Sequence, residues 1–354
     1  MKFSCRHLIA PCALVASFGA AAQIAVSVNG PPSSVALIDM KTMPPRLLDE
    51  IALPGAAAVP SAAVAPDESI ALVAGERLSV IDLTQRPPRV IAALATGPSP
   101  AGVSINRAGT LALVANRGDC TVSVFGIAGK TLTPAGTVSL GGPSDCGASH
   151  VAISPDGRSA LVTRDNDHKV SVLSIDGTKV STTQRDLSPG LRPHAIDFCV
   201  PGQIAVVANA GAGQGDADTL AVIDMTAKPP RIIETLTVGQ TPQALKCSPD
   251  GSYIAVVVIN GSDKPKDSPF HDPQGRLVLY MVVGKTLQKF GQLPIGPWPS
   301  GVAFAPDGLT VLVQSKTQQD IQVLRIDGMR LVDTGQRIPL NSGGVALRAA
   351  DKPR

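Results

Sequence analysis

Ala152-Ile153-Ser154-Pro155-Asp156-Gly157 is the stretch from which the fold of this chain can be worked out. An alternating apolar stretch, Ser159 to Thr163, follows it at once. In such a sequence Pro presets the φ angle of the second turn position, and Gly tolerates a positive φ at the turn exit. The motif therefore predicts a tight turn between two β-strands.

The same motif recurs along the chain. Clear copies lie at 245–251 and 302–308, and weaker copies at 63–68, 103–109, 195–202 and 345–351. The seven turns have a mean spacing of about 47 residues, and two further strands fit between one turn and the next. Four strands in a repeat of this length are typical of a β-propeller blade.

The two ends of the chain indicate how the ring closes. Residues 344–351 resemble the first strand of a blade with no second strand after it, and residues 24–55 resemble strands two to four without a first. We therefore expect both termini to complete one blade, which leaves no unpaired edge. The predicted fold is all-β, a single seven-bladed β-propeller over residues 23–354 with four antiparallel strands per blade. We expect a monomer, because the ring is already closed.

The Ser-Pro-Asp-Gly strand pairs resemble the YVTN repeat and the lactonase-like seven-bladed propellers. The resemblance implies the same fold over the whole of 23–354. The lactonase branch carries a histidine before the inner strand of two adjacent blades, and Ser149-His150-Val151 and Arg192-Pro193-His194 are similar. That branch then has Asn-Glu where this chain reads Asn209-Ala210, so the acid is missing.

Composition agrees with a turn-rich folded protein. Gly and Pro together make about 18 % of the 354 residues, below the 25–30 % typical of low-complexity disorder. Phe, Tyr and Trp number only ten, so most of the hydrophobic content is Ala, Val, Leu and Ile. This composition excludes a disordered chain, a coiled coil and a multi-span membrane protein.

The amino terminus has the plan of a secretory signal peptide over residues 1–22. Lys2 and Arg6 precede an apolar run from Leu8 to Phe18, and Ala20-Ala21-Ala22 offers a cleavage site. A membrane anchor is the alternative, but the run is shorter than the ~20 residues of a span. We expect a periplasmic or extracellular protein that is not integral to the membrane.

Cleavage would lower the net charge from +3 to +1, so we expect no nucleic acid partner.

Four cysteines remain after such cleavage, and an exported protein allows disulfides between them. Cys120 falls in a loop between strands two and three, and Cys146 in the crossover that leaves the same blade. We therefore predict a Cys120–Cys146 disulfide. Cys247 follows an inward apolar pattern, so we expect it to be a buried core residue, and we do not expect a bond between Cys199 and Cys247.

Propeller topology sorts the polar residues between two faces. The loops between strands two and three and the crossovers between blades share one face, called here the top face, and the short turns share the bottom face. All four histidines after residue 22, the single Trp and the longest loops fall on the top face. Such concentration predicts ligand binding there. The candidate ligand-binding residues are His150, His194, Gln243, Trp298, Arg117, Arg164 and Asn209.

The top-face residues permit several chemistries. Asp165, Asp167, Asp216 and Asp218 could offer oxygen ligands to a divalent cation such as Ca²⁺, although they form no diagnostic ligand set. A lactonase would need a base and a cation. His150 or His194 could be the base, and Arg192, Arg117 or Arg164 the cation. No cofactor is required by any motif.

Two functional hypotheses therefore compete. The first is an exported, non-catalytic protein that binds a protein, glycan or small molecule on the top face. The second is a lactonase-like hydrolase with a histidine base at the mouth of the central channel. A redox-complex subunit is permitted by the fold but supported by no motif.

Overall fold

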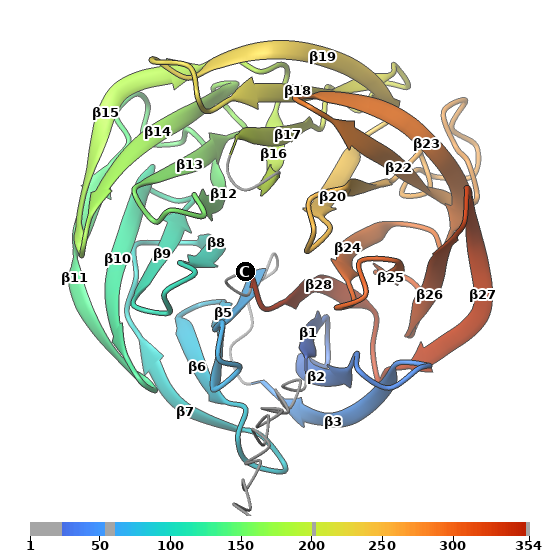
Figure 1. The fold of residues 1–354 in the computed structure, drawn as a ribbon, viewed down its shortest axis with the longest axis horizontal. Helices are drawn as coiled ribbons and strands as arrows, with labels where there is room; N and C mark the ends of the chain where they lie inside the picture. The colour runs from blue at the N-terminus through green and yellow to red at the C-terminus, as the bar shows by residue number, and fades with distance from the viewer. Residues whose placement is uncertain (1–22, 54–60, 200–202, 352–354) are drawn as a thin grey trace, which may run out of the picture.

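The computed structural model describes residues 23–53, 61–199 and 203–351. Within these residues, 28 strands form seven four-stranded antiparallel sheets, arranged in a ring like the blades of a propeller (Figure 1). The predicted seven-bladed β-propeller is thus confirmed. The expected signal peptide, residues 1–22, lies outside the described residues, as do 200–202 at the end of one predicted turn.

Each blade runs outward from an innermost strand that faces the axis of the ring. From the inside outward, blade 1 is β4 (Ser61–Val64), β5 (Ile70–Ala74), β6 (Leu78–Asp82) and β7 (Arg89–Leu94); blade 2 is β8 (Pro100–Ile105), β9 (Leu111–Asn116), β10 (Thr121–Ala128) and β11 (Thr131–Ser139); blade 3 is β12 (Ala148–Ile153), β13 (Ser159–Arg164), β14 (Lys169–Asp176) and β15 (Lys179–Leu187). Blade 4 is β16 (Pro193–Cys199), β17 (Ile204–Asn209), β18 (Asp218–Asp224) and β19 (Arg231–Gly239); blade 5 is β20 (Pro242–Cys247), β21 (Tyr253–Val258), β22 (Gly275–Val283) and β23 (Thr286–Ile295); blade 6 is β24 (Pro299–Phe304), β25 (Thr310–Ser315), β26 (Asp320–Asp327) and β27 (Arg330–Pro339). Blade 7 is β28 (Gly344–Ala349), β1 (Ile24–Asn29), β2 (Ser34–Asp39) and β3 (Arg46–Ala52).

Blade 7 joins the two ends of the described chain, as predicted. β28 supplies the inner strand and pairs antiparallel with β1, with Ala349 opposite Ala25 and Ala346 opposite Val28. Without β28 the inner edge of β1 would expose its backbone hydrogen-bonding groups. The closed ring removes that edge.

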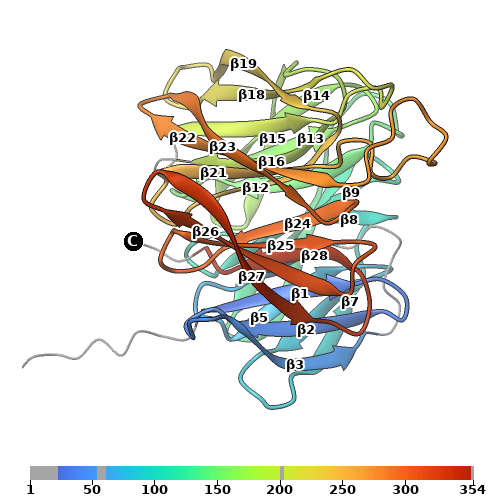
Figure 2. The same cartoon turned by 90° about the vertical axis from the view of Figure 1, so that its right-hand side faces the viewer.

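The repeated turns have the geometry that their residues predict. Gly157 and Gly308 adopt φ angles of +70° and +66°, a region that residues with a Cβ enter only with strain. These turns lie on the bottom face. The loop between β21 and β22, residues 259–274, projects from the opposite, top face (right-hand side of Figure 2).

The hydrophobic core consists of layers between neighbouring blades. In one layer, Ile70 and Leu72 of β5 pack with Val103 and Ile105 of β8. These side chains are small and branched, and the burial of each contributes roughly 1.5–3 kcal/mol. Thin layers of this kind explain why a chain of this length needs so few aromatic residues.

Two disulfides cross-link the ring, one predicted and one not. Cys120–Cys146 is confirmed, with a Cα–Cα distance of 5.6 Å. The expectation against a bond between Cys199 and Cys247 is wrong, because these residues are also bonded, with the same Cα–Cα distance. They end β16 and β20, which are inner strands of adjacent blades, and the backbone N–H of Cys247 donates to Asp197 of β16 at 3.0 Å.

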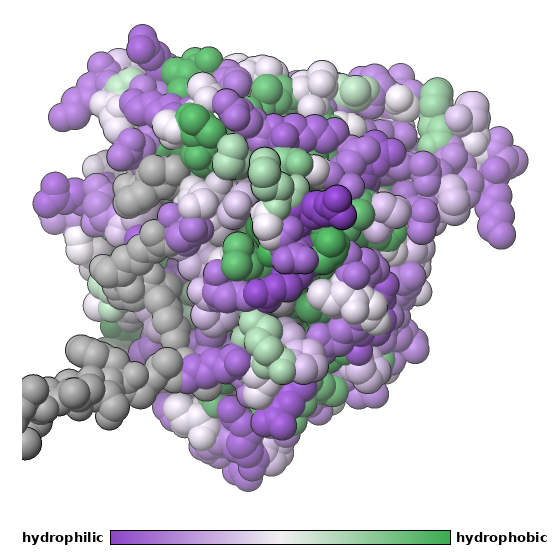
Figure 3. Space-filling model, turned by 45° about the vertical axis from the view of Figure 1, so that its right-hand side comes forward, coloured by the Kyte–Doolittle hydropathy of each residue, from purple (hydrophilic) through white to green (hydrophobic). Residues whose placement is uncertain are grey.

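In the described part of the chain, no helix is long and apolar enough to cross a membrane. The surface in Figure 3 is largely hydrophilic, with hydrophobic side chains scattered among the polar ones.

Candidate functional site at the mouth of the central channel

The top end of the channel opens into a cavity of about 340 Å³, called here the mouth cavity. Every inner strand starts at the top face, so the first residues of these strands form most of the wall. They are Ser61, Ala101, His150, His194, Gln243, Ser300 and Val345. The charged groups on the same wall are Arg117, Asp165, Arg192 and Arg348.

His150 and His194 stand side by side on the inner strands of blades 3 and 4. Their ring centroids are 5.2 Å apart and the rings are tilted by 51°. The buried hydroxyl of Thr163 fixes this arrangement, since it accepts from the backbone N–H of His150 at 2.9 Å and donates to the carbonyl of His194 at 2.8 Å. The two histidines that the sequence singled out are therefore brought together.

A polar chain extends from His194 in two directions. On one side, His194 Nε2 lies 3.2 Å from the side-chain amide of Gln243. On the other side, His194 Nδ1 lies 3.9 Å from Asp165 Oδ2, which accepts from Arg117 Nη1 at 2.8 Å. Burial alone would raise the pKa of Asp165, but the approach of His194 and Arg117 outweighs it and lowers that pKa.

His150 occupies a different electrostatic environment. Burial lowers the pKa of its imidazole well below 6.5, and the neighbouring His194 and Arg348 lower it further. The neutral ring is therefore the dominant form at neutral pH. A neutral imidazole can accept a proton, which a general base must do.

Arg348 is a site residue that the sequence reasoning missed. It lies on β28 and lines both the mouth cavity and the narrower channel below it, which has a volume of about 80 Å³. Burial lowers its pKa, but an arginine keeps its charge at any physiological pH. The sequence could have indicated Arg348 as a channel residue, because it lies four residues after Gly344 on a stretch that was interpreted as an inner strand.

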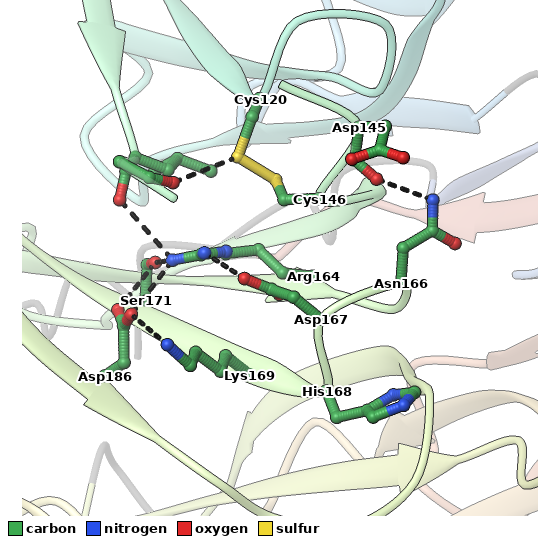
Figure 4. Close-up of polar contacts among 12 residues, drawn as sticks. Cys120, Asp145, Cys146, Arg164, Asn166, Asp167, His168, Lys169, Ser171 and Asp186 are labelled. Atoms are coloured by element: carbon green, nitrogen blue, oxygen red, sulfur yellow. Dashed lines mark hydrogen bonds and ion pairs between the residues drawn. A yellow bond between two sulfur atoms is a disulfide. The ribbon is translucent and has the colours of Figure 1, made fainter. Parts of the chain in front are cut away.

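Three predicted binding residues, Arg164, Asn209 and Trp298, do not line the mouth cavity. Arg164 is 1 % exposed, and its guanidinium is held by Asp167, by Ser171 at 3.1 Å and by Asp186 at 2.9 Å (Figure 4). It is thus engaged in a buried ion-pair cluster beside the Cys120–Cys146 disulfide.

Asn209 also has a structural role in this arrangement. Its amide donates to the hydroxyl of Thr219 at 2.9 Å and to the carbonyl of Pro189 at 3.1 Å. Asn116 and Asn29 end the second strands of their own blades in the same way and donate to hydroxyls of the third strand. Asn209 therefore belongs to a repeated strand-locking contact.

The four aspartates suggested for a divalent cation do not converge. Asp165 pairs with Arg117, Asp167 pairs with Arg164, Asp216 is exposed, and Asp218 accepts from the backbone N–H of Thr241 at 2.8 Å. Burial raises the pKa of Asp218, and nearby Asp216 raises it further. Among the residues that the structure describes, no three His, Cys, Asp or Glu side chains form a group that could hold a metal ion.

Trp298 lies beside the mouth cavity in a second cavity, also of about 340 Å³, called here the side cavity. The two cavities share six lining residues, which are Arg192, Ala210, Thr241, Gln243, Ser300 and Val345. Of the predicted binding residues, Arg117, His150, His194 and Gln243 therefore line the mouth cavity, Trp298 lines the side cavity beside it, and Gln243 belongs to both.

Comparisons with known proteins support the fold. Neither the family models nor the curated proteins give a match. Among solved structures, a Bacteroides uniformis protein proposed to be a 6-phosphogluconolactonase has a TM-score of 0.74 at 20 % identity, over 93 % of this chain and 100 % of its own. The chain has the fold of the lactonase-like seven-bladed propellers.

Other solved structures with this fold have different functions. The periplasmic gluconolactonase of Pseudomonas aeruginosa has a TM-score of 0.72 at 16 % identity, over 94 % of this chain and 100 % of its own. Hydrazine synthase of Kuenenia stuttgartiensis has a TM-score of 0.65 at 19 % identity, over 83 % of this chain and 89 % of its own. At these identities the likeness extends to the fold alone, so a function has to be argued from the site.

Proposed function

We propose that the protein binds a small, hydroxyl-rich carboxylate, such as a sugar acid, in the mouth cavity. The observation that carries the proposal is the excess of fixed positive charge there. Arg117, Arg192 and Arg348 line the cavity, and among the described residues Asp165 is the only carboxylate on its wall. Arginine presents a planar set of donors that matches a carboxylate.

The uncharged wall suits hydroxyl groups. Ser300 and Thr241 offer hydroxyls, and Gln243 offers both an amide donor and an acceptor. The volume of about 340 Å³ is at the small end of the range for ligand pockets, which favours a metabolite over a folded partner.

An exported location belongs to the same proposal. Two disulfides persist in an oxidising compartment such as the periplasm or the extracellular space. One similar solved structure is a periplasmic protein. The signal-peptide pattern of residues 1–22 points the same way.

Titration calorimetry with galacturonate tests the binding proposal. We expect saturable binding, at least tenfold weaker in Arg348→Gln and His194→Ala. Ser99→Ala changes an exposed top-face residue that lines neither cavity and should bind as the wild type does. Equal binding of neutral galactose, or no saturation by galacturonate, would contradict the proposal.

The neutral form of the His150 imidazole favours a second candidate function, which is hydrolysis of a sugar lactone. Water would attack the lactone carbonyl carbon while neutral His150 accepts its proton. The ring C–O bond would then break, and the leaving alkoxide would take that proton from the imidazolium. Arg348 would stabilise the negative charge that develops on the carbonyl oxygen.

Hydrolysis of glucono-1,5-lactone above its spontaneous rate distinguishes the two functions. A hydrolase should lose this activity in His150→Gln while retaining galacturonate binding. Its kcat/KM should stay flat from pH 8 through 6.5 and fall only at a lower pH, where His150 takes up a proton, because the pKa of His150 is held well below 6.5. A wild-type rate equal to the spontaneous rate would leave binding as the function.

A further inference from the structure

We infer that the side cavity is a second sugar subsite, so that the ligand is an acidic oligosaccharide spanning both cavities. This inference rests on the proposed function of the mouth cavity. The six shared lining residues make the two cavities neighbours along one wall of the top face. A ligand longer than one sugar could therefore occupy both.

A repeated backbone feature supports a binding role for this wall. Ser99, Arg192, Thr241 and Trp298 each precede the proline that starts an inner strand, and their φ angles are +51°, +53°, +57° and +49°. In each of these four blades, the carbonyl of the residue before the proline accepts a hydrogen bond from the backbone N–H of the residue that follows the second strand, at 2.8–3.0 Å. The backbone is thus the same from blade to blade, while the side chain at this position, called here the rim position, differs.

Three of the four rim residues line the side cavity. They are Arg192, Thr241 and Trp298, from the consecutive blades 4, 5 and 6. A non-glycine residue in the left-handed region costs on the order of 1 kcal/mol, and blade 3 has Gly147 at the corresponding hydrogen bond. Three consecutive blades thus present their rim side chains to one cavity.

The side chains of the cavity suit an acidic sugar. Trp298 offers an aromatic surface, with the ammonium of Lys316 4.3 Å from the ring centroid on one side. Among the described residues that line this cavity, Lys264, Lys316 and Arg192 contribute three positive charges and Asp263 contributes one carboxylate. This balance favours a ligand that carries carboxylates.

Asp263 adds a requirement for hydroxyl donors. Its Oδ1 atom is buried and has no hydrogen-bond donor among the described residues. Sugar hydroxyls could donate to the Asp263 carboxylate where it lines the cavity, while an apolar sugar face contacts the Trp298 ring. An aromatic ring, a carboxylate acceptor and surrounding cations together favour a uronate oligosaccharide over an acidic peptide.

Calorimetry with galacturonate and trigalacturonate tests the inference. The wild type should bind the trimer at least tenfold more tightly than the monomer. Trp298→Ala should lose this gain and keep the monomer Kd within twofold. Lys264→Gln, on the loop between β21 and β22, changes no inner strand and should lose several-fold of the trimer affinity alone.

The controls separate this inference from the proposed function. Ser99→Ala alters a rim position outside both cavities and should retain the full gain, and Arg348→Gln should weaken monomer and trimer alike. Equal affinities for monomer and trimer in the wild type would overturn the second subsite, and so would an unchanged preference for the trimer in Trp298→Ala. Neither result would contradict the site in the mouth cavity. Binding of neither sugar would overturn both, and tighter binding of triglutamate than of trigalacturonate would assign the side cavity to an acidic peptide.

Discussion

At the scale of single residues, the imidazole of His150 depends on its neighbours. It is half-buried at the channel mouth, where its partial burial, the neighbouring His194 and the charge of Arg348 all lower its pKa. The neutral ring is therefore a property of the assembled ring of blades, since His150 and Arg348 come from blades 3 and 7.

Replacement of Arg348 tests this electrostatic coupling. Arg348→Gln removes one positive charge that disfavours the imidazolium, so the pKa of His150 should rise towards 6.5. Proton–carbon NMR titration of the imidazole resonances measures the shift, and the signal lost in His150→Gln identifies the resonance of His150 among the four top-face histidines. An unchanged or lower pKa of His150 would contradict the assigned environment.

The lowered pKa of His150 also links stability to pH. The unfolded chain binds a proton at His150 near pH 6.5, while the folded protein does not, so the free energy of unfolding should fall as pH drops below about 6.5. The slope from one such group reaches at most about 1.4 kcal/mol per pH unit. Urea unfolding at pH 7.5 and 5.5 should show a smaller loss in His150→Gln than in the wild type, and equal losses would argue against the lowered pKa.

Asn209 illustrates a residue whose role is structural. Asn209→Ala would leave the Thr219 hydroxyl and the Pro189 carbonyl without their buried donor, at a cost of about 1–3 kcal/mol. Asn116→Ala in blade 2 is the matched control and should cost about the same. Calorimetry below both melting temperatures should give an unchanged galacturonate Kd, and a selective loss in Asn209→Ala would return this residue to the binding site.

At the scale of elements, the disulfides tie together strands and loops of the inner ring. Cys199–Cys247 joins β16 to β20 across 48 residues of sequence, and Cys120–Cys146 closes 26 residues within blade 2 and its crossover. A longer closed loop restricts the unfolded chain more, so the first bond should stabilise the fold slightly more than the second.

Paired substitutions measure this contribution. Cys199→Ala with Cys247→Ala should lower the free energy of unfolding by about 2–4 kcal/mol, roughly 0.5 kcal/mol more than Cys120→Ala with Cys146→Ala. Urea unfolding of both double variants under oxidising conditions checks the values. Loss of Cys199–Cys247 without any change in the urea midpoint would contradict a stabilising bond between the blades.

The sequence could predict the features that the repeat determines, which are the number of blades and the end of the ring at which a residue lies. Turn motifs at regular spacing predicted seven blades, and the positions just before two inner strands predicted that His150 and His194 would lie near the mouth of the channel. It could not predict contacts that depend on register between elements. Arg164 meets Asp186 only because β14 and β15 place Ser171 opposite Asp186, and Cys199 meets Cys247 only because two inner strands converge.

At the scale of the whole molecule, β28 both closes the ring and completes the site. Ala346 and Leu347 of this strand enter the hydrophobic layers on its two sides, and Arg348 faces the channel. Truncation after Gly343 should therefore abolish cooperative unfolding and expose the β1 edge to self-association. Light scattering and urea titration check this, and a monomeric, cooperatively folded truncation product would contradict closure by β28.

The central claim is that the mouth cavity binds a small carboxylate. A crystal structure of the protein with galacturonate tests it most directly. We predict the sugar in the mouth cavity, with its carboxylate within hydrogen-bond distance of Arg348 or Arg192 and a hydroxyl near Gln243. Galacturonate bound instead at the bottom end of the channel, where Lys246 and Arg107 line a separate cavity, or no ordered sugar at saturating concentration, would contradict the account.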